Sequence, residues 1–247
     1  MPEKFLTDYY IKKESKLIKD FKSRLILAKG LLKEYFKQYD PESLIDQIIN
    51  EYKGYFPSIP YLGGFKNPLT QILVRCVSEL ATFRVLEKNG LSFREIGEFH
   101  YRFNLKLHKR RREALIQAKK KPSQYPFETV YVEYQKKLTE ETQKREYPDN
   151  WIMEFIDGKG KAFEWGWDIY QCGVQQAYKV LGGEKYLPLI CLGDFYEAEG
   201  LGFGFSRTES LGFGGKKCTH RFVKNAKSPK AWPPYDLKEF NQEFWSE

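Results

Sequence analysis

The sequence has no long apolar run and few cysteines. No stretch reaches the roughly eighteen consecutive apolar residues that a transmembrane helix needs, so we expect no membrane partner. The first residues, MPEKFLTDYY, lack the apolar segment of a secretory signal peptide, which favours a cytoplasmic protein. In that compartment, the four cysteines are expected to be thiols, metal ligands or nucleophiles rather than disulfide partners.

The composition is that of a globular protein with an excess of basic residues. Hydrophobic residues make up 41% and charged residues 30% of the 247 positions, which excludes an intrinsically disordered chain. The net charge is +8, and the densest basic run covers residues 106–112, followed by 119–121. A nucleic-acid site needs its basic residues on one face, whereas the helical pattern here spreads them around a helix. We therefore expect no nucleic-acid partner.

The first 121 residues have the pattern of helices. Apolar residues recur every three or four positions through 18–39, 44–52 and 69–83, as on the buried face of a helix. Cys76 falls within the last of these stripes, which predicts a buried core thiol away from the other three cysteines. Four signals mark helix boundaries: Asp40-Pro41, Asn67-Pro68, Asn89-Gly90 and the capping box Ser92-Phe-Arg-Glu95.

Beyond Pro122 the pattern changes, and strands alternate with helices. Alternation and β-forming residues predict strands at 127–134 and 151–156, and a helical pattern follows at 167–181. An apolar segment at 187–191 leads into one or two helical turns at 193–199. The stretch GFGFSRTESLGFGGKKCTHRF predicts a hairpin, with strands at 202–211 and 217–224 joined by glycines 212–215, before a proline-rich surface tail.

These patterns predict an α+β fold. We expect a helical N-terminal region over residues 1–121, and a region over 122–247 with an antiparallel sheet and packed helices, together forming one compact unit. The sequence leaves the oligomeric state open.

Three cysteines in the second region each have polar neighbours. Asp168 and Cys172, four residues apart, would share one face of a helix, and Cys191-x-x-Asp194 spans a turn. On a strand, period two places Cys218 and His220 on the same face. The preceding Lys216 and Lys217 would lower the pKa of the Cys218 thiol, because nearby cations stabilise a thiolate.

Arg207 and Thr208 lie on the other strand of the expected hairpin, which would bring them close to Cys218 and His220. An arginine there can hold a carboxylate with two parallel hydrogen bonds. The residues alone leave three interpretations open: core thiols without function, a thiol active site, or a metal site.

Six segments together resemble the L-2-amino-thiazoline-4-carboxylic acid hydrolase family. They are PYLGG (60–64) with the asparagine at 67, NGLSFREIG (89–97), DIYQC (168–172), LPLICLGDF (187–195), SRTESL (206–211) and KCTHRF (217–222). The likeness runs from about residue 52 to 224. This chain departs from the family pattern at Thr219-His220, where an acidic and an aromatic residue are expected after the last cysteine.

The resemblance implies hydrolysis of a small cyclic isothiourea that carries a carboxylate. It implies Asp194 as the partner of the cationic nitrogens, Cys218 as the nucleophile, and His220 as the group that moves protons, with Cys191 and Cys172 beside them. Arg207, with Thr208, would hold the substrate carboxylate. In an alternative, Cys172, Cys191 and Cys218 bind zinc, which activates a water molecule. A second alternative is a non-enzymatic domain that binds a metal or small ligand or senses redox state.

Overall fold

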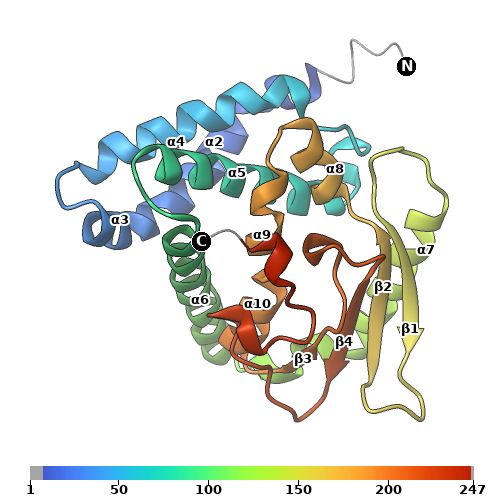
Figure 1. Cartoon of the computed structure of the whole chain (residues 1–247). Helices are drawn as coiled ribbons and strands as arrows, with labels where there is room; N and C mark the ends of the chain where they lie inside the picture. Colours follow the sequence, from blue (N-terminus) through green and yellow to red (C-terminus); the bar gives the residue numbers. More distant parts are fainter. Residues whose placement is uncertain (1–7, 246–247) are drawn as a thin grey trace. The chain divides into compact units, whose positions relative to one another are not determined.

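The computed structural model describes residues 8–245, whose contacts group them into two units (Figure 1). The first unit contains the residues up to Ile96 together with Gly173–Tyr186. The second contains Gly97–Cys172 and the residues from Leu187 onward. Helices and one antiparallel sheet are both present, so the predicted α+β class is confirmed. The boundary near residue 121 stays a prediction.

The first unit is helical, as its sequence predicts. Buried apolar side chains line the shared faces of the helices, including Leu44, Ile48, Leu73, Val77 and Leu80. Its elements are α2 (Glu14–Leu25), η1 (Ile26–Ala28), α3 (Lys29–Tyr35), α4 (Pro41–Tyr55), η2 (Phe56–Ser58), η3 (Gly64–Lys66), α5 (Leu69–Lys88), α8 (Gly173–Val180) and η5 (Glu184–Tyr186).

The predicted helix boundaries lie where the local signals put them. Ser92 N donates to Glu95 Oε2 at 2.8 Å, and Glu95 N donates back to Ser92 Oγ, which completes the capping box before α6 (Phe93–Gln117). Gly90 follows α5 with φ of 102°, a conformation that glycine adopts without strain.

Cys76 is only half-buried, so the prediction of a core thiol is wrong in that respect. Leu73, Val77 and Leu80 form the buried stripe of α5, and Cys76 lies at its edge. The helical period explains this, because a residue three positions after Leu73 is rotated about 60° from it. Cys76 belongs to the first unit, whereas the other three cysteines belong to the second.

The second unit is built on a four-stranded antiparallel sheet with strand order β1-β2-β4-β3 (Figure 1). The strands are β1 (Ile152–Asp157), β2 (Trp165–Gln171), β3 (Gly204–Ser206) and β4 (Cys218–Val223). Helix α7 packs along β1. The remaining elements are η4 (Pro122–Phe127), α7 (Thr129–Gln143), α9 (Leu187–Cys191), α10 (Gly193–Leu201), η6 (Leu211–Phe213), η7 (Pro234–Asp236) and η8 (Gln242–Phe244), with most of α6.

Two predicted elements are wrong. Residues 127–134 are not a strand, because η4 ends at Phe127 and α7 begins at Thr129. Helix α7 buries the polar residues Gln135, Thr139 and Thr142, while Val130 is 83% exposed, so its apolar alternation does not mark the buried face. Residues 167–181 are not one helix, because β2 continues to Gln171 before α8 begins. Pairing of β2 with β1 and β4 here overrides the helical pattern.

The predicted hairpin is confirmed with shorter strands. Gly204 pairs with Val223 and Ser206 with Arg221, so the hairpin is centred on residues 212–215 as expected. Arg207 and Thr208 follow β3 instead of lying on it. The expectation of a surface tail is also wrong in part, because Trp232, Leu237 and Glu239 are buried. No helix in the described part of the chain is long and apolar enough to cross a membrane.

Candidate functional site

The sheet places Cys218 and His220 on a face rich in aromatic residues. Cys218, His220 and Phe222 alternate along β4, and the register sets Ile169, Trp167 and Trp165 opposite them on β2. Trp165 and Phe222 stack with ring centroids 4.0 Å apart. The expected shared face of Cys218 and His220 therefore agrees with the strand register.

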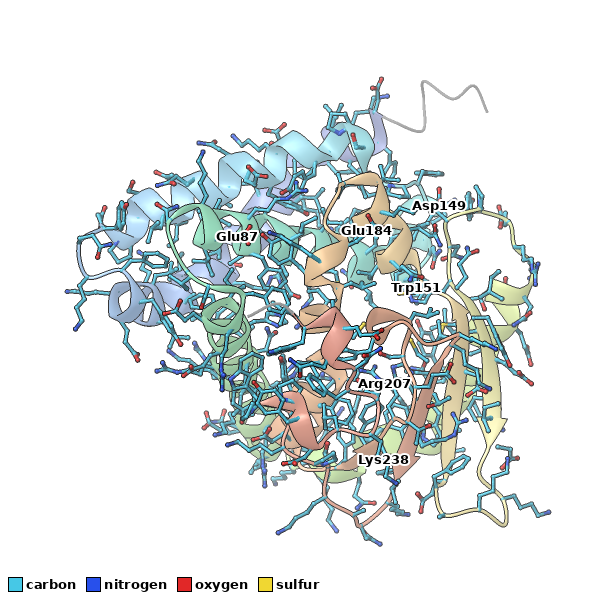
Figure 2. The ribbon with its side chains drawn as sticks, viewed as in Figure 1. Glu87, Asp149, Trp151, Glu184, Arg207 and Lys238 are labelled. Carbon is cyan, nitrogen blue, oxygen red and sulfur yellow. The ribbon has the colours of Figure 1, made fainter. Side chains whose placement is uncertain are left out.

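Arg207, which is labelled in Figure 2, is the buried centre of a charged cluster in the second unit. Only 1% of its side chain is exposed. Its Nε and Nη2 donate to the carboxylate of Glu239, which is 0% exposed, and its Nη1 donates to Asp194 at 2.7 Å. Nη2 also donates to the carbonyl of Cys191. Two carboxylates thus face one guanidinium, and His220 lies beside Asp194 as a second group that is cationic when protonated.

Asp194 is the accessible carboxylate of this cluster. Its Oδ2 accepts from Arg207 and from His220 Nε2, the latter at 3.0 Å, whereas 43% of the Asp194 side chain is exposed. Both bonds that Asp194 makes within the described residues end on Oδ2, so Oδ1 is left for a ligand. Burial alone would raise the pKa of Asp194, but the neighbouring His220 and Arg207 outweigh it and lower this pKa to about 2.

His220 Nε2 lies between two groups of the charged cluster. It is 3.0 Å from Asp194 Oδ2 and 3.1 Å from Arg207 Nη1, so it donates to the carboxylate or accepts from the guanidinium according to its tautomer. Nδ1 is buried and has no hydrogen-bond partner among the described residues.

A cavity of about 50 Å³ adjoins Asp194. This volume is several times what a single water molecule needs. Two carboxylates and the π faces of several aromatic rings favour a flat, positively charged ligand. The lining residues are Tyr125, Pro126, Tyr131, Trp167, Asp194, Glu197, Phe203, Phe205 and Phe222.

Two of the thiols border the turn η6, outside this cavity lining. Leu211 N donates to Cys218 Sγ at 3.3 Å, and a Cβ on Gly212 would lie 2.3 Å from Cys191 Sγ. Cys172 is close enough to raise the pKa of both thiols. Cys191 and Cys218 therefore both border η6, with Arg207 close enough to oppose the rise in the pKa of each.

The pKa values of Cys191 and Cys218 are both raised in this arrangement. Burial raises the pKa of Cys218 to about 12, against the opposing effect of Arg207. Burial likewise raises the pKa of Cys191 well above its ordinary value. The expectation that Lys217 lowers the pKa of Cys218 is not met. Lys217 Nζ instead contacts Asp168, which also accepts from Arg221 at 2.7 Å.

Two further expectations do not fit the geometry. Asp168 lies on β2, so it does not share a helix face with Cys172. Arg207 directs its N–H groups at protein atoms, which leaves it no edge for a substrate carboxylate. Thr208 is paired with Thr219, whose Oγ1 accepts from Thr208 N at 3.0 Å.

Sequence reasoning missed Glu239, Glu197 and the aromatic lining. Glu239 comes from the tail, where nothing in the local pattern distinguishes it from its acidic neighbours. The high aromatic content, 17% of all residues, was the available signal for the cavity. The residues that line the cavity come from distant segments of the chain, so no sequence spacing identifies them as one site.

The zinc alternative does not fit the described residues. Residues 8–245 contain no group of three or more histidine, cysteine, aspartate or glutamate side chains arranged to hold a metal ion. We therefore derive no catalytic step through a metal.

The turn between the two thiols gives a direct test of this geometry. We expect Gly212→Ala to lower activity about tenfold or more, because the added Cβ would displace Cys191 from the turn. Gly193→Ala is the matched control, since a Cβ there meets nothing within 4 Å. The assay is kcat/KM for the thiazoline carboxylate that the family resemblance implies, measured alongside the melting temperature. Equal activity in the two variants would contradict this arrangement.

Comparison with known proteins agrees with the resemblance in the sequence. The family model described as L-2-amino-thiazoline-4-carboxylic acid hydrolase matches residues 74–222, well over half of the chain. This region includes Cys191, Asp194, Arg207, Cys218 and His220, and excludes Glu239. No curated protein and no solved structure matches the chain. The chain belongs to the L-2-amino-thiazoline-4-carboxylic acid hydrolase family, which is named for a hydrolase.

Proposed function

We propose that this protein hydrolyses a small cyclic amidine of the isothiourea type, such as 2-amino-thiazoline-4-carboxylate. The observation that carries the proposal is Asp194, an ionised carboxylate with an available oxygen beside an aromatic cavity. Family membership supports the same class of reaction.

Asp194 suits the recognition of an amidinium group. The carbon between sulfur and two nitrogens carries a delocalised positive charge when the amidine is protonated. An N–H group of that cation can donate to Asp194 Oδ1, while its flat face stacks against the aromatic lining.

The reaction adds one water molecule across the ring. A nucleophile bonds to the carbon between sulfur and nitrogen, and the ring carbon–sulfur bond breaks. The departing sulfur takes a proton and becomes a free thiol, and with water as the nucleophile the product is then carbamoyl-cysteine. When the nucleophile is an enzyme thiolate, a water molecule then displaces it from the same carbon and restores the thiol.

We propose Cys218 as that nucleophile and His220 as the group that transfers the proton. Because Cys218 borders η6 outside the cavity lining, this requires the substrate to extend from Asp194 past His220 toward the thiol. The two residues share one face of β4, and His220 also contacts Asp194. We further propose that Cys191 and Cys172 belong to the same site as Cys218. Because a nearby cation favours the thiolate, the bound amidinium would lower the pKa of Cys218, which burial keeps high in the ligand-free protein.

Asp194→Asn tests the amidinium contact. We expect kcat/KM to fall roughly 100-fold, because a charge-assisted hydrogen bond becomes a neutral one. The measurement is formation of carbamoyl-cysteine by chromatography. The control is Glu199→Gln, which changes a carboxyl group on the same helix that does not line the cavity. Full activity of a folded Asp194→Asn protein would refute the assignment.

The low pKa of Asp194 makes the stability of the fold depend on pH. Its folded pKa of about 2 lies below the ordinary 3.8, so the ionised carboxylate stabilises the fold above pH 3.8. This contribution is lost as the pH falls through 2. Substrate affinity should therefore not decline between pH 8 and pH 5 through protonation of Asp194.

A further inference from the structure

The substrate carboxylate needs a partner other than Arg207. Arg207 is buried, and its N–H groups are directed at Glu239, Asp194 and the backbone of Cys191. The cavity lining itself contains carboxylates and aromatic rings but no lysine or arginine within the described residues. A basic side chain at the rim of the cavity is the remaining kind of partner.

Arg111 occupies that position. Its Nη1 donates to Glu197 at 2.5 Å, and its guanidinium lies over the ring of Tyr125, 5.0 Å from the ring centroid. Glu197 and Tyr125 both line the cavity. Arg111 comes from α6, within the basic run that the function has not otherwise used. Two separate contacts therefore hold this guanidinium beside the cavity.

Arg111 also has the capacity to bind an anion. Its side chain is 41% exposed, in contrast to 1% for Arg207. Within the described residues it forms one ion pair, through Nη1, so the other edge of the guanidinium is left for a ligand. Its contacts with Glu197 and Tyr125 restrict its rotamers before binding, which reduces the entropy lost when a carboxylate docks.

We propose that Arg111 receives the carboxylate of a ligand whose planar cation is held at Asp194. This inference rests on the proposed function and specifies its substrate class: small, flat amidinium compounds that also carry a carboxylate. The cation would lie among the aromatic rings, and the carboxylate would point toward α6. Arg111 thus determines specificity rather than taking part in bond cleavage.

The test compares two pairs of compounds, each with and without a carboxylate. KM and kcat are measured for 2-amino-thiazoline-4-carboxylate and 2-amino-thiazoline. Dissociation constants are measured by calorimetry for guanidinoacetate and methylguanidine, so that this readout does not depend on hydrolysis. The variants are Arg111→Met, Arg111→Lys and the matched control Arg110→Met, an exposed neighbour in the same basic run.

In Arg111→Met, we expect KM or Kd of each carboxylate compound to rise roughly tenfold to a hundredfold. The compounds without a carboxylate, and kcat, should change less than about threefold. Arg111→Lys should recover part of the affinity, because it keeps the charge but loses the planar fork. Arg110→Met should resemble the wild type.

The inference is overturned if Arg111→Met leaves the preference for carboxylate compounds unchanged, or if Arg110→Met reduces it equally. It is also overturned if wild-type protein binds guanidinoacetate no more tightly than methylguanidine. A wild type that hydrolyses neither thiazoline contradicts the proposed function. In that case, an Arg111-dependent preference for guanidinoacetate still supports the binding role of Arg111.

Discussion

Replacing Cys218 by serine should reduce turnover of 2-amino-thiazoline-4-carboxylate roughly 10³-fold or more. A serine hydroxyl is far less acidic than a thiol and cannot be ionised by a bound amidinium in the same setting. The substitution removes little volume, so the fold should remain intact despite the burial of Cys218. Single-turnover kinetics, with mass spectrometry to detect a covalent adduct on Cys218, is the appropriate measurement.

The control is Cys76→Ala, because Cys76 belongs to the first unit and lies at the edge of its helix stripe. This variant should lose a little stability and keep its activity. A Cys218→Ser protein that retains more than about a tenth of the wild-type rate would exclude thiolate attack. It would favour direct attack by water beside Asp194 and His220.

The raised pKa of Cys218 gives a second measurement on the same thiol. With a pKa of about 12 instead of 9.0, its thiolate fraction near neutral pH is roughly 10³-fold lower than that of an ordinary thiol. Alkylation by iodoacetamide should be slow and should accelerate with rising pH up to about pH 12. Rapid alkylation at pH 7 would show that the ligand-free thiol is already ionised.

Of the variants proposed for this protein, Arg207→Met should produce the largest loss of stability, about 3–5 kcal/mol in the free energy of unfolding. The substitution leaves Glu239, which is 0% exposed, without its guanidinium partner in the interior. It also removes one of the two groups that hold Asp194 Oδ2 in place. Urea unfolding followed by circular dichroism measures the change.

The matched variant is Arg207→Met combined with Glu239→Gln. Removing both charges eliminates the uncompensated carboxylate, so the double variant should be more stable than Arg207→Met alone. A destabilisation below about 1 kcal/mol in Arg207→Met would mean that the buried ion pair is not a major element of this fold.

The helices of the first unit and the hairpin of the second were predictable because their signals are local. The capping box joins Ser92 and Glu95, three residues apart, and the hairpin is centred on its glycine-rich turn. Strand β1 was likewise evident from alternation that ends at Asp157-Gly158. Such features depend on backbone preferences within a few residues, which the order of amino acids specifies directly.

Helix α7 and strand β2 were not predictable from the same kind of signal. The β-forming residues at the start of α7 lie on a helix whose buried face is polar. This polar face is stabilised by β1, since Thr142 Oγ1 accepts a hydrogen bond from Met153 N on that strand. The helical pattern after Trp167 is overridden by pairing with β1 and β4. In both cases a partner distant in sequence decides the local conformation.

The sequence by itself determined which chemistry is present in the site. It supplied thiols, a carboxylate, an arginine and a histidine, and period two along β4 placed Cys218 and His220 on one face. Tertiary structure alone decided how they are paired. It directs Arg207 toward Glu239, 32 positions away, and brings Arg111 to the cavity rim through Glu197. Ion pairs between distant segments follow from the path of the folded chain, which no local spacing encodes.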